Sequence, residues 1–304
     1  MASLPCIFTI LVVIFFPSQL NAKLVNQMGN DQSQKLTYHN GPLLSGKITI
    51  NLLWYGSFKP AQKAIVTDFI GSLSSPNPGS EPSVGAWWKM LDQYYTNDLG
   101  KPKPQLSLGQ QTEDVGYSMG KSLTSVQVAK LATRGGNINT VNVLLTDPNV
   151  TVDGFCRNRC GTHGSGVGSN KFTYIWVGNS ETQCPGYCAW PFHRPIYGPQ
   201  NPPLVAPNGD VGLDGMIMSL GSMLAGTVTN PFGNGYYQGS MEAPLEAASA
   251  CPGVFGKGAY PGYPGNLLVD SATGASYNSK GNNGRKFLLP ALFDLSTSTC
   301  ATLT

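Results

Sequence analysis

The stretch that decides the fold class is residues 47–56, Lys-Ile-Thr-Ile-Asn-Leu-Leu-Trp-Tyr-Gly. This β-branched and aromatic run ends at a glycine, so it predicts a strand. Residues 59–73 follow with apolar side chains at helical spacing, which predicts a helix. The alternation continues, with further strands expected at residues 105–109, 140–146 and 171–178 and further helices at residues 84–95, 124–131 and 214–228.

Strands that alternate with helices are typical of an α/β or α+β domain. We therefore expect a single domain with a central mixed sheet, packed helices and a loop-rich, disulfide-stapled C-terminal half. Only 12% of the residues are charged, whereas the chain has 37 glycines and 23 prolines. Such a composition favours stabilisation by loops, turns and aromatic packing over ion pairs. No internal repeat or linker divides the chain.

The N-terminus has the pattern of a secretory signal peptide at residues 1–22. An apolar run at residues 7–16 is followed by Pro17 and by Ala22 at the expected cleavage point. This run is shorter than the roughly 20 residues that span a bilayer. No Lys or Arg precedes it, so a retained anchor is the alternative. We expect a secreted domain at residues 23–304 without membrane insertion after cleavage.

The formal charge of +3 is small, and no Lys/Arg cluster occurs. Because nucleic-acid-binding domains carry a basic patch, we expect no nucleic-acid partner. A weak attraction to an acidic matrix such as pectin is compatible with this charge.

Seven cysteines become six once Cys6 is removed with the signal peptide. An even number in an oxidising compartment predicts three disulfides. We expect Cys251 to pair with Cys300, and the other four to staple a loop region around residues 155–190. Two C-x3-C pairs leave a zinc site as the alternative. The cysteines concerned are Cys156, Cys160, Cys184, Cys188, Cys251 and Cys300. A sequon at Asn149 follows a turn signal and predicts an exposed glycosylation site.

The motifs of common hydrolases are absent from the sequence. No serine fits G-x-S-x-G, and no His-Glu pair fits the zinc-protease helix motif. Asp214 is expected to cap the helix that follows it, and the remaining carboxylates, Glu246 among them, leave a glycoside hydrolase open as an alternative. We therefore name no catalytic, metal-binding or cofactor-binding residue and expect no cofactor.

Aromatic side chains gather among glycines and prolines in the C-terminal half. Aromatic rings fill cores, but they also stack on the apolar faces of sugars. The first interpretation makes them core residues, and the second predicts a ligand surface of Tyr187, Trp190, Tyr236, Tyr237, Tyr260 and Tyr263.

Several segments resemble the EXORDIUM-like, or phosphate-induced, family of plant secreted proteins. They are residues 52–56, 155–164, 183–192, 229–237 and 253–260. The resemblance implies an apoplast or cell-wall protein linked to cell expansion, brassinosteroid-responsive growth and carbon or phosphate status. We expect a non-catalytic protein that acts by binding, with a wall polysaccharide, a peptide or a receptor ectodomain as partner. A wall-polysaccharide hydrolase or a divergent metalloprotease is the alternative.

Residues 214–231 resemble, more distantly, the active-site helix of zincin metalloproteases. On that alignment Ser222, Met223 and Gly226 stand where the metal-binding histidine, the catalytic glutamate and a later acidic residue would be. None of these side chains is an imidazole ligand or a general base. The resemblance therefore implies a degenerate zincin-like scaffold, and the alternative is an ordinary buried apolar helix.

Overall fold

A computed structural model describes residues 35–75, 82–96, 101–133, 140–157, 159–166 and 172–304. Residues 35–304 form one compact unit. The predicted signal peptide, its cleavage point and Cys6 lie outside the described residues.

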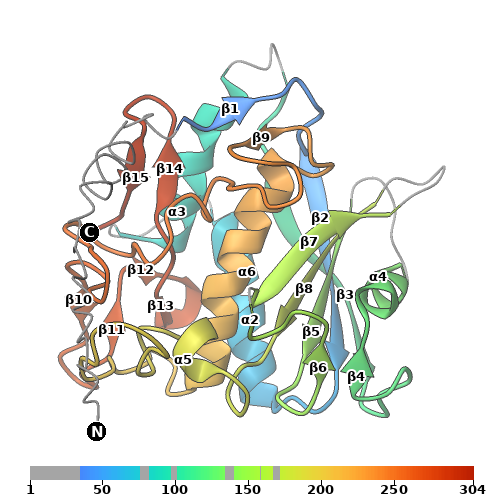
Figure 1. Ribbon diagram of the computed structural model, residues 1–304, viewed down its shortest axis with the longest axis horizontal. Coiled ribbons are helices and arrows are strands. Elements are labelled where there is room, and N and C mark those ends of the chain that lie inside the picture. Colours follow the sequence, from blue (N-terminus) through green and yellow to red (C-terminus); the bar gives the residue numbers. More distant parts are fainter. Residues whose placement is uncertain (1–34, 76–81, 97–100, 134–139, 158, 167–171) are drawn as a thin grey trace, which may run out of the picture. The chain divides into compact units, whose positions relative to one another are not determined.

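A five-stranded mixed sheet forms the centre of this unit, as the sequence predicts (Figure 1). Its strands, in spatial order, are β3 (Gln105–Asp114), β2 (Lys47–Tyr55), β5 (Thr140–Thr146), β8 (Thr173–Gly178) and β7 (Gly161–Ser165). The first four are parallel, and β7 is antiparallel to β8 at one edge. Every residue of β5 is buried, as expected for an internal parallel strand covered on both faces.

Helices cover both faces of the sheet (Figure 1). On one face, α2 (Pro60–Leu73) and α6 (Val211–Thr229) share the main core with Val141, Val143 and Leu145 of β5. On the other face, α4 (Ser125–Ala132) packs with Leu144 and Trp176 in a second cluster. This division follows from the strand geometry, because successive side chains of β5 point to opposite faces.

The remaining elements are short and differ in detail from the prediction. The helix expected at residues 84–95 is α3 (Val84–Lys89), which continues as a 3₁₀ helix from Met90 to Tyr95. Pairs of short strands complete the fold: β1 (Thr37–Tyr38) with β9 (Tyr236–Tyr237), β4 (Ser122–Leu123) with β6 (Thr151–Val152), β10 (Leu268–Val269) with β11 (Ser276–Tyr277), β12 (Ser279–Lys280) with β13 (Lys286–Phe287), and β14 (Leu292–Asp294) with β15 (Thr299–Ala301).

Three disulfides staple the chain, as the sequence predicts. They are Cys156–Cys184, Cys160–Cys188 and Cys251–Cys300. The first two lie on either side of the short helix α5 (Pro185–Cys188), and the third is the expected long-range bridge. Since all six cysteines are consumed in these bonds, none of them remains as a zinc ligand.

The longest helix, α6, is a core element. Its length and composition would also fit a membrane span, but 78% of its most apolar window is buried inside the protein. The prediction that Asp214 caps this helix is wrong. Asp210 occupies the N-cap position and accepts from the Leu213 N–H at 2.9 Å. Asp214 lies inside the first turn and is buried instead.

Asp214 is a buried carboxylate held by one neighbour. The backbone N–H and the side-chain amide of Asn208 donate to its two oxygens at 2.9 and 2.6 Å. Burial raises the pKa of Asp214 to about 7, although these hydrogen bonds oppose the shift. The folded protein therefore binds a proton that the unfolded chain, with a pKa of 3.8, releases at lower pH.

This shift predicts a pH-dependent stability. Because the pKa is higher in the folded state, the Asp214 contribution should be fully present below about pH 4 and should be lost as the pH rises to about 7. The loss amounts to at most about 4 kcal/mol. Asp214→Asn should remove this slope, while losing one hydrogen bond at every pH. Urea unfolding of both proteins between pH 4 and 8 measures the difference, and equal slopes would contradict it.

Candidate functional site

An aromatic groove is lined in part by Val269 of β10 and Ser276 of β11. Figure 1 shows these two strands in the loop-rich part of the molecule. The groove consists of two clefts with volumes of about 250 and 480 Å³. Trp190 and Gly262 line both clefts, so the two are neighbours that share these residues. Tyr263 lines the smaller cleft, and Tyr197 and Tyr260 line the larger one.

Trp190 is fixed in place by the segment that precedes it. The disulfides Cys156–Cys184 and Cys160–Cys188 hold this segment. Ala189 packs closely on α6, because a Cβ added at Gly215 would lie 2.8 Å from the Cβ of Ala189. Phe192 on the other side is buried. The backbone around Trp190 is therefore anchored on both sides, which favours a rigid binding surface over one that forms on contact.

The opposite wall of the groove is a tight turn between two tyrosines. The backbones of Tyr260 and Tyr263 exchange hydrogen bonds of 2.8 and 3.0 Å, and their ring centroids lie 5.1 Å apart. The side-chain amide of Asn201 donates to the Gly262 carbonyl at 3.1 Å. This bond ties the segment that holds Asn201 to the turn between Tyr260 and Tyr263.

Trp190 differs from the other four tryptophans of the chain. Those four are buried, and each donates its indole N–H inside the fold at 2.7–3.2 Å: Trp54 to Gln111, Trp87 to Pro290, Trp88 to Pro104 and Trp176 to Thr146. Trp190 is half-buried, and its indole donates to none of the described residues. A fixed aromatic ring with an unused donor in a groove is typical of a binding site.

The structure brings together only part of the predicted aromatic surface. Trp190, Tyr260 and Tyr263 line the groove, whereas Tyr187 is 41% exposed but lines neither cleft. Tyr236 and Tyr237 are buried in β9, which pairs with β1, so we no longer include them in the surface. Tyr197, which is 84% exposed, was missed. Its position in a Pro/Gly-rich stretch was the available signal.

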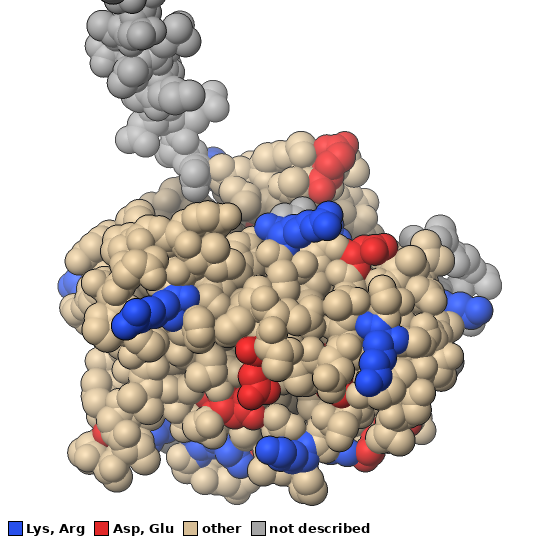
Figure 2. Space-filling model, turned by 60° about the horizontal axis from the view of Figure 1, so that its bottom comes forward, with Lys and Arg blue, Asp and Glu red and all other residues tan. Residues whose placement is uncertain are grey.

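The groove carries no charge of its own. Neither cleft is lined by Lys, Arg, Asp or Glu among the described residues. Figure 2 shows one face of the molecule, most of which is uncharged, with several Lys or Arg side chains close together along its lower edge. His193 also lines the smaller cleft.

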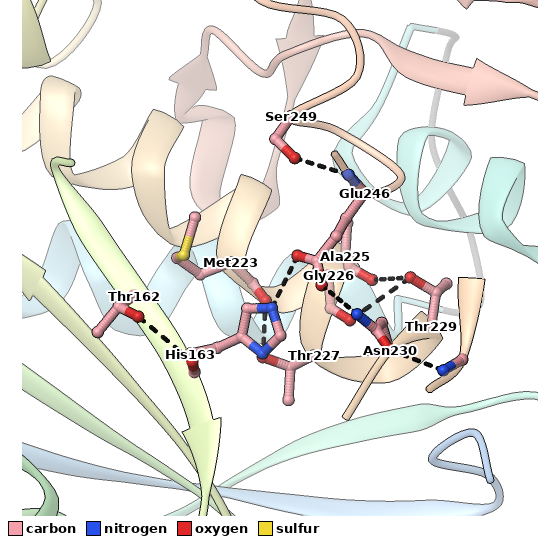
Figure 3. Close-up of polar contacts among 11 residues, drawn as sticks. Thr162, His163, Met223, Ala225, Gly226, Thr227, Thr229, Asn230, Glu246 and Ser249 are labelled. Atoms are coloured by element: carbon pink, nitrogen blue, oxygen red, sulfur yellow. Dashed lines mark hydrogen bonds and ion pairs between the residues drawn. The ribbon is translucent and has the colours of Figure 1, made fainter. Parts of the chain in front are cut away.

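A second polar cluster lies between the sheet edge and the end of α6 (Figure 3). Glu246 reaches from its loop to His163 of β7, with 2.7 Å between Oε2 and the ring Nε2. Its other oxygen accepts from the Asn230 side-chain amide, also at 2.7 Å. The side chains of His163 and Glu246 are only 13% and 9% exposed. We call this set of three side chains the Glu246 cluster.

Gly226 of α6 makes room for this cluster. A Cβ at that position would lie 2.4 Å from Glu246 Oε2 and 3.1 Å from His163 Nε2. The Nδ1 atom of His163 is buried without a partner among the described residues. Within those residues, no group of three or more His, Cys, Asp or Glu side chains could hold a metal ion. The arrangement thus resembles a closed structural contact more than an open reaction site.

Comparison with known proteins identifies the family. A family model described as "Phosphate-induced protein 1 conserved region" matches residues 36–303. Protein PHOSPHATE-INDUCED 1 of Nicotiana tabacum is 62% identical over 288 residues, covering 92% of each chain. Protein EXORDIUM of Arabidopsis thaliana is 61% identical over 284 residues, covering 90% of each. The chain belongs to the EXORDIUM/phosphate-induced family.

These matches confirm the resemblance to the EXORDIUM-like family that the sequence segments indicated. Protein EXORDIUM-like 2 of Arabidopsis thaliana, at 53% identity, covers 97% of this chain and 98% of its own length, so the similarity to EXORDIUM proteins extends through the whole fold. No solved structure matches the chain. The zincin-like interpretation of α6 therefore stays a prediction.

Proposed function

We propose that this EXORDIUM-family protein is an extracellular plant protein of the apoplast and cell wall. It promotes or regulates cell expansion, in connection with brassinosteroid and nutrient status, and it acts by binding a wall component in the aromatic groove. Family membership and three disulfides support the extracellular assignment. The exposed turn position of Asn149 supports its use as a glycosylation site.

The observation that carries the proposal is the state of Trp190. Its indole is anchored by disulfide-braced backbone, lines both clefts and keeps its donor unused among the described residues. Trp190 packs beside Phe255 on the third core cluster, yet its ring stays only partly buried and its N–H has no partner among the described residues. A ligand that covers the ring and accepts from its N–H explains both features.

Retention on isolated plant cell walls tests this proposal. Trp190→Ala should lose most of the retention, because the central contact of the groove is removed. Tyr187→Ala is the matched control, since that tyrosine is exposed and lines neither cleft. In plants that lack the protein, Tyr187→Ala should restore cell length as the wild type does, and Trp190→Ala should restore it less. Equal retention and equal cell length for wild type and Trp190→Ala would contradict the proposal.

A hydrolase is the competing function, and the Glu246 cluster is the feature that favours it. Both carboxylate oxygens of Glu246 already hold partners within the protein, and its side chain is nearly buried. A general acid or base needs a path to the substrate oxygen, so the geometry supports binding better than hydrolysis. Turnover of wall polysaccharide that disappears in a folded Glu246→Gln protein would reverse this choice.

A further inference from the structure

We propose that the ligand of the aromatic groove is an uncharged glycan chain that stacks on Trp190 and extends into both clefts. This inference rests on the proposed binding function and specifies the chemical class of the ligand. Three properties of the groove support it: its lack of charge, its combination of unused donors and acceptors, and its division into two clefts around one ring.

The lack of charge selects against an acidic polymer. Recognition of carboxylates in proteins depends on Arg or Lys side chains, usually with paired hydrogen bonds. Neither cleft is lined by such a residue among the described ones. The formal charge of +3 on the whole chain gives only a diffuse attraction that salt would screen. A uronate chain would therefore lose the hydration of its carboxylates without gaining an Arg or Lys partner in either cleft.

The unused polar atoms select against a proline-rich peptide, which is the other common occupant of aromatic grooves. Two residues that line the smaller cleft carry a polar atom that pairs with no described residue: Trp190 has the donor Nε1, and Asn201 has the acceptor Oδ1. Proline-rich segments supply carbonyl acceptors but few N–H donors, so they would leave Asn201 Oδ1, on an exposed side chain, to water alone. Sugar hydroxyls donate and accept, and they fit both atoms.

The position of Trp190 between two clefts selects for a chain over a single sugar. A ring stacked on Trp190 has cleft volume on either side, about 250 Å³ toward Tyr263 and about 480 Å³ toward Tyr260. Tyr260 is 64% exposed and lies in the larger cleft, where its face is open for a second sugar. The C–H faces of β-linked sugars can stack on aromatic rings, and their hydroxyls remain free to pair with Trp190 Nε1 and Asn201 Oδ1.

Isothermal titration calorimetry with defined probes tests the inference. The probes are β-glucan, mannan and xylan oligosaccharides, an oligogalacturonate of equal length, and a proline-rich peptide. At least one uncharged oligosaccharide should bind the secreted protein, more tightly as its length grows beyond a disaccharide. Trp190→Ala should weaken this binding about tenfold or more, and Tyr187→Ala should leave it unchanged. Tyr260→Ala, at an exposed site, checks the larger cleft without a risk to folding.

The possible results separate this inference from the function on which it rests. Trp190-dependent binding of the oligogalacturonate or the peptide, in place of the uncharged sugars, would overturn the glycan class and leave groove binding intact. Retention on walls that depends on Trp190, with no uncharged probe bound, would do the same. Absence of binding to every probe, together with wall retention that ignores Trp190, would overturn both.

Discussion

Replacing Glu246 by alanine is expected to lower the free energy of unfolding by about 3–5 kcal/mol. The side chain holds His163 of the edge strand and Asn230 at the end of α6 at the same time. Its loss leaves two nearly buried polar groups without their partner, and each such group carries a desolvation penalty. Urea unfolding at constant pH, followed by tryptophan fluorescence, measures the effect through the transition midpoint.

The matched control for this change is Glu246→Gln. Glutamine keeps the shape and can still accept from Asn230 while its amide faces His163, so we expect a clearly smaller loss. Gly226→Ala should destabilise the protein although all three side chains of the Glu246 cluster are retained, because its Cβ would lie 2.4 Å from Glu246 Oε2. If Glu246→Ala unfolds at the same urea concentration as the wild type, the cluster does not hold α6 to the sheet edge.

Removal of the Cys251–Cys300 disulfide is expected to cost about 2–5 kcal/mol. This bond closes the longest disulfide loop of the described chain, with a sequence separation of 49, and longer loops restrict the unfolded state more. Cys251 is also buried in the main core, where it packs near the paired strands β14 and β15. The double variant Cys251→Ser, Cys300→Ser avoids a free thiol and is compared with the wild type in urea.

The disulfides Cys156–Cys184 and Cys160–Cys188 provide a control for this removal. Each of those bonds spans 28 residues, and the two lie close together, so removal of one leaves much of the same constraint. The loss for the Cys160→Ser, Cys188→Ser variant should therefore be smaller. An unchanged midpoint for the Cys251–Cys300 variant would show that the C-terminal strands are held by packing alone.

Much of the fold could be predicted from the sequence because the sheet is internal. Residues 140–146 are rich in Val and Leu, as expected for a strand covered on both faces, and β5 occupies this range. Helix ends were harder to place, because more than one acidic residue lies near the start of α6. Asp210 has the extended backbone of a cap and receives the Leu213 N–H, while Asp214 is one turn further along. Spacing alone did not distinguish the two.

The candidate site could be predicted only in part, because its contacts join distant segments. The aromatic residues of the groove were visible as a composition signal, but sequence does not distinguish a buried tyrosine such as Tyr236 from an exposed one such as Tyr260. The Glu246 cluster was not predictable. His163 and Glu246 are 83 positions apart, and no motif connects them. Only the folding of β7 against α6 brings them together.

The central claim is that the indole N–H of Trp190 contacts an uncharged glycan. The indole region of a proton–nitrogen NMR spectrum tests it most directly, because the chain has only five tryptophans. The signal that is absent from a Trp190→Phe variant should exchange readily with solvent and should shift when an uncharged β-glucan, mannan or xylan oligosaccharide that binds is added. The other four, which donate inside the fold, should stay protected and unmoved. Oligosaccharide binding that leaves the Trp190 signal in place would contradict the account.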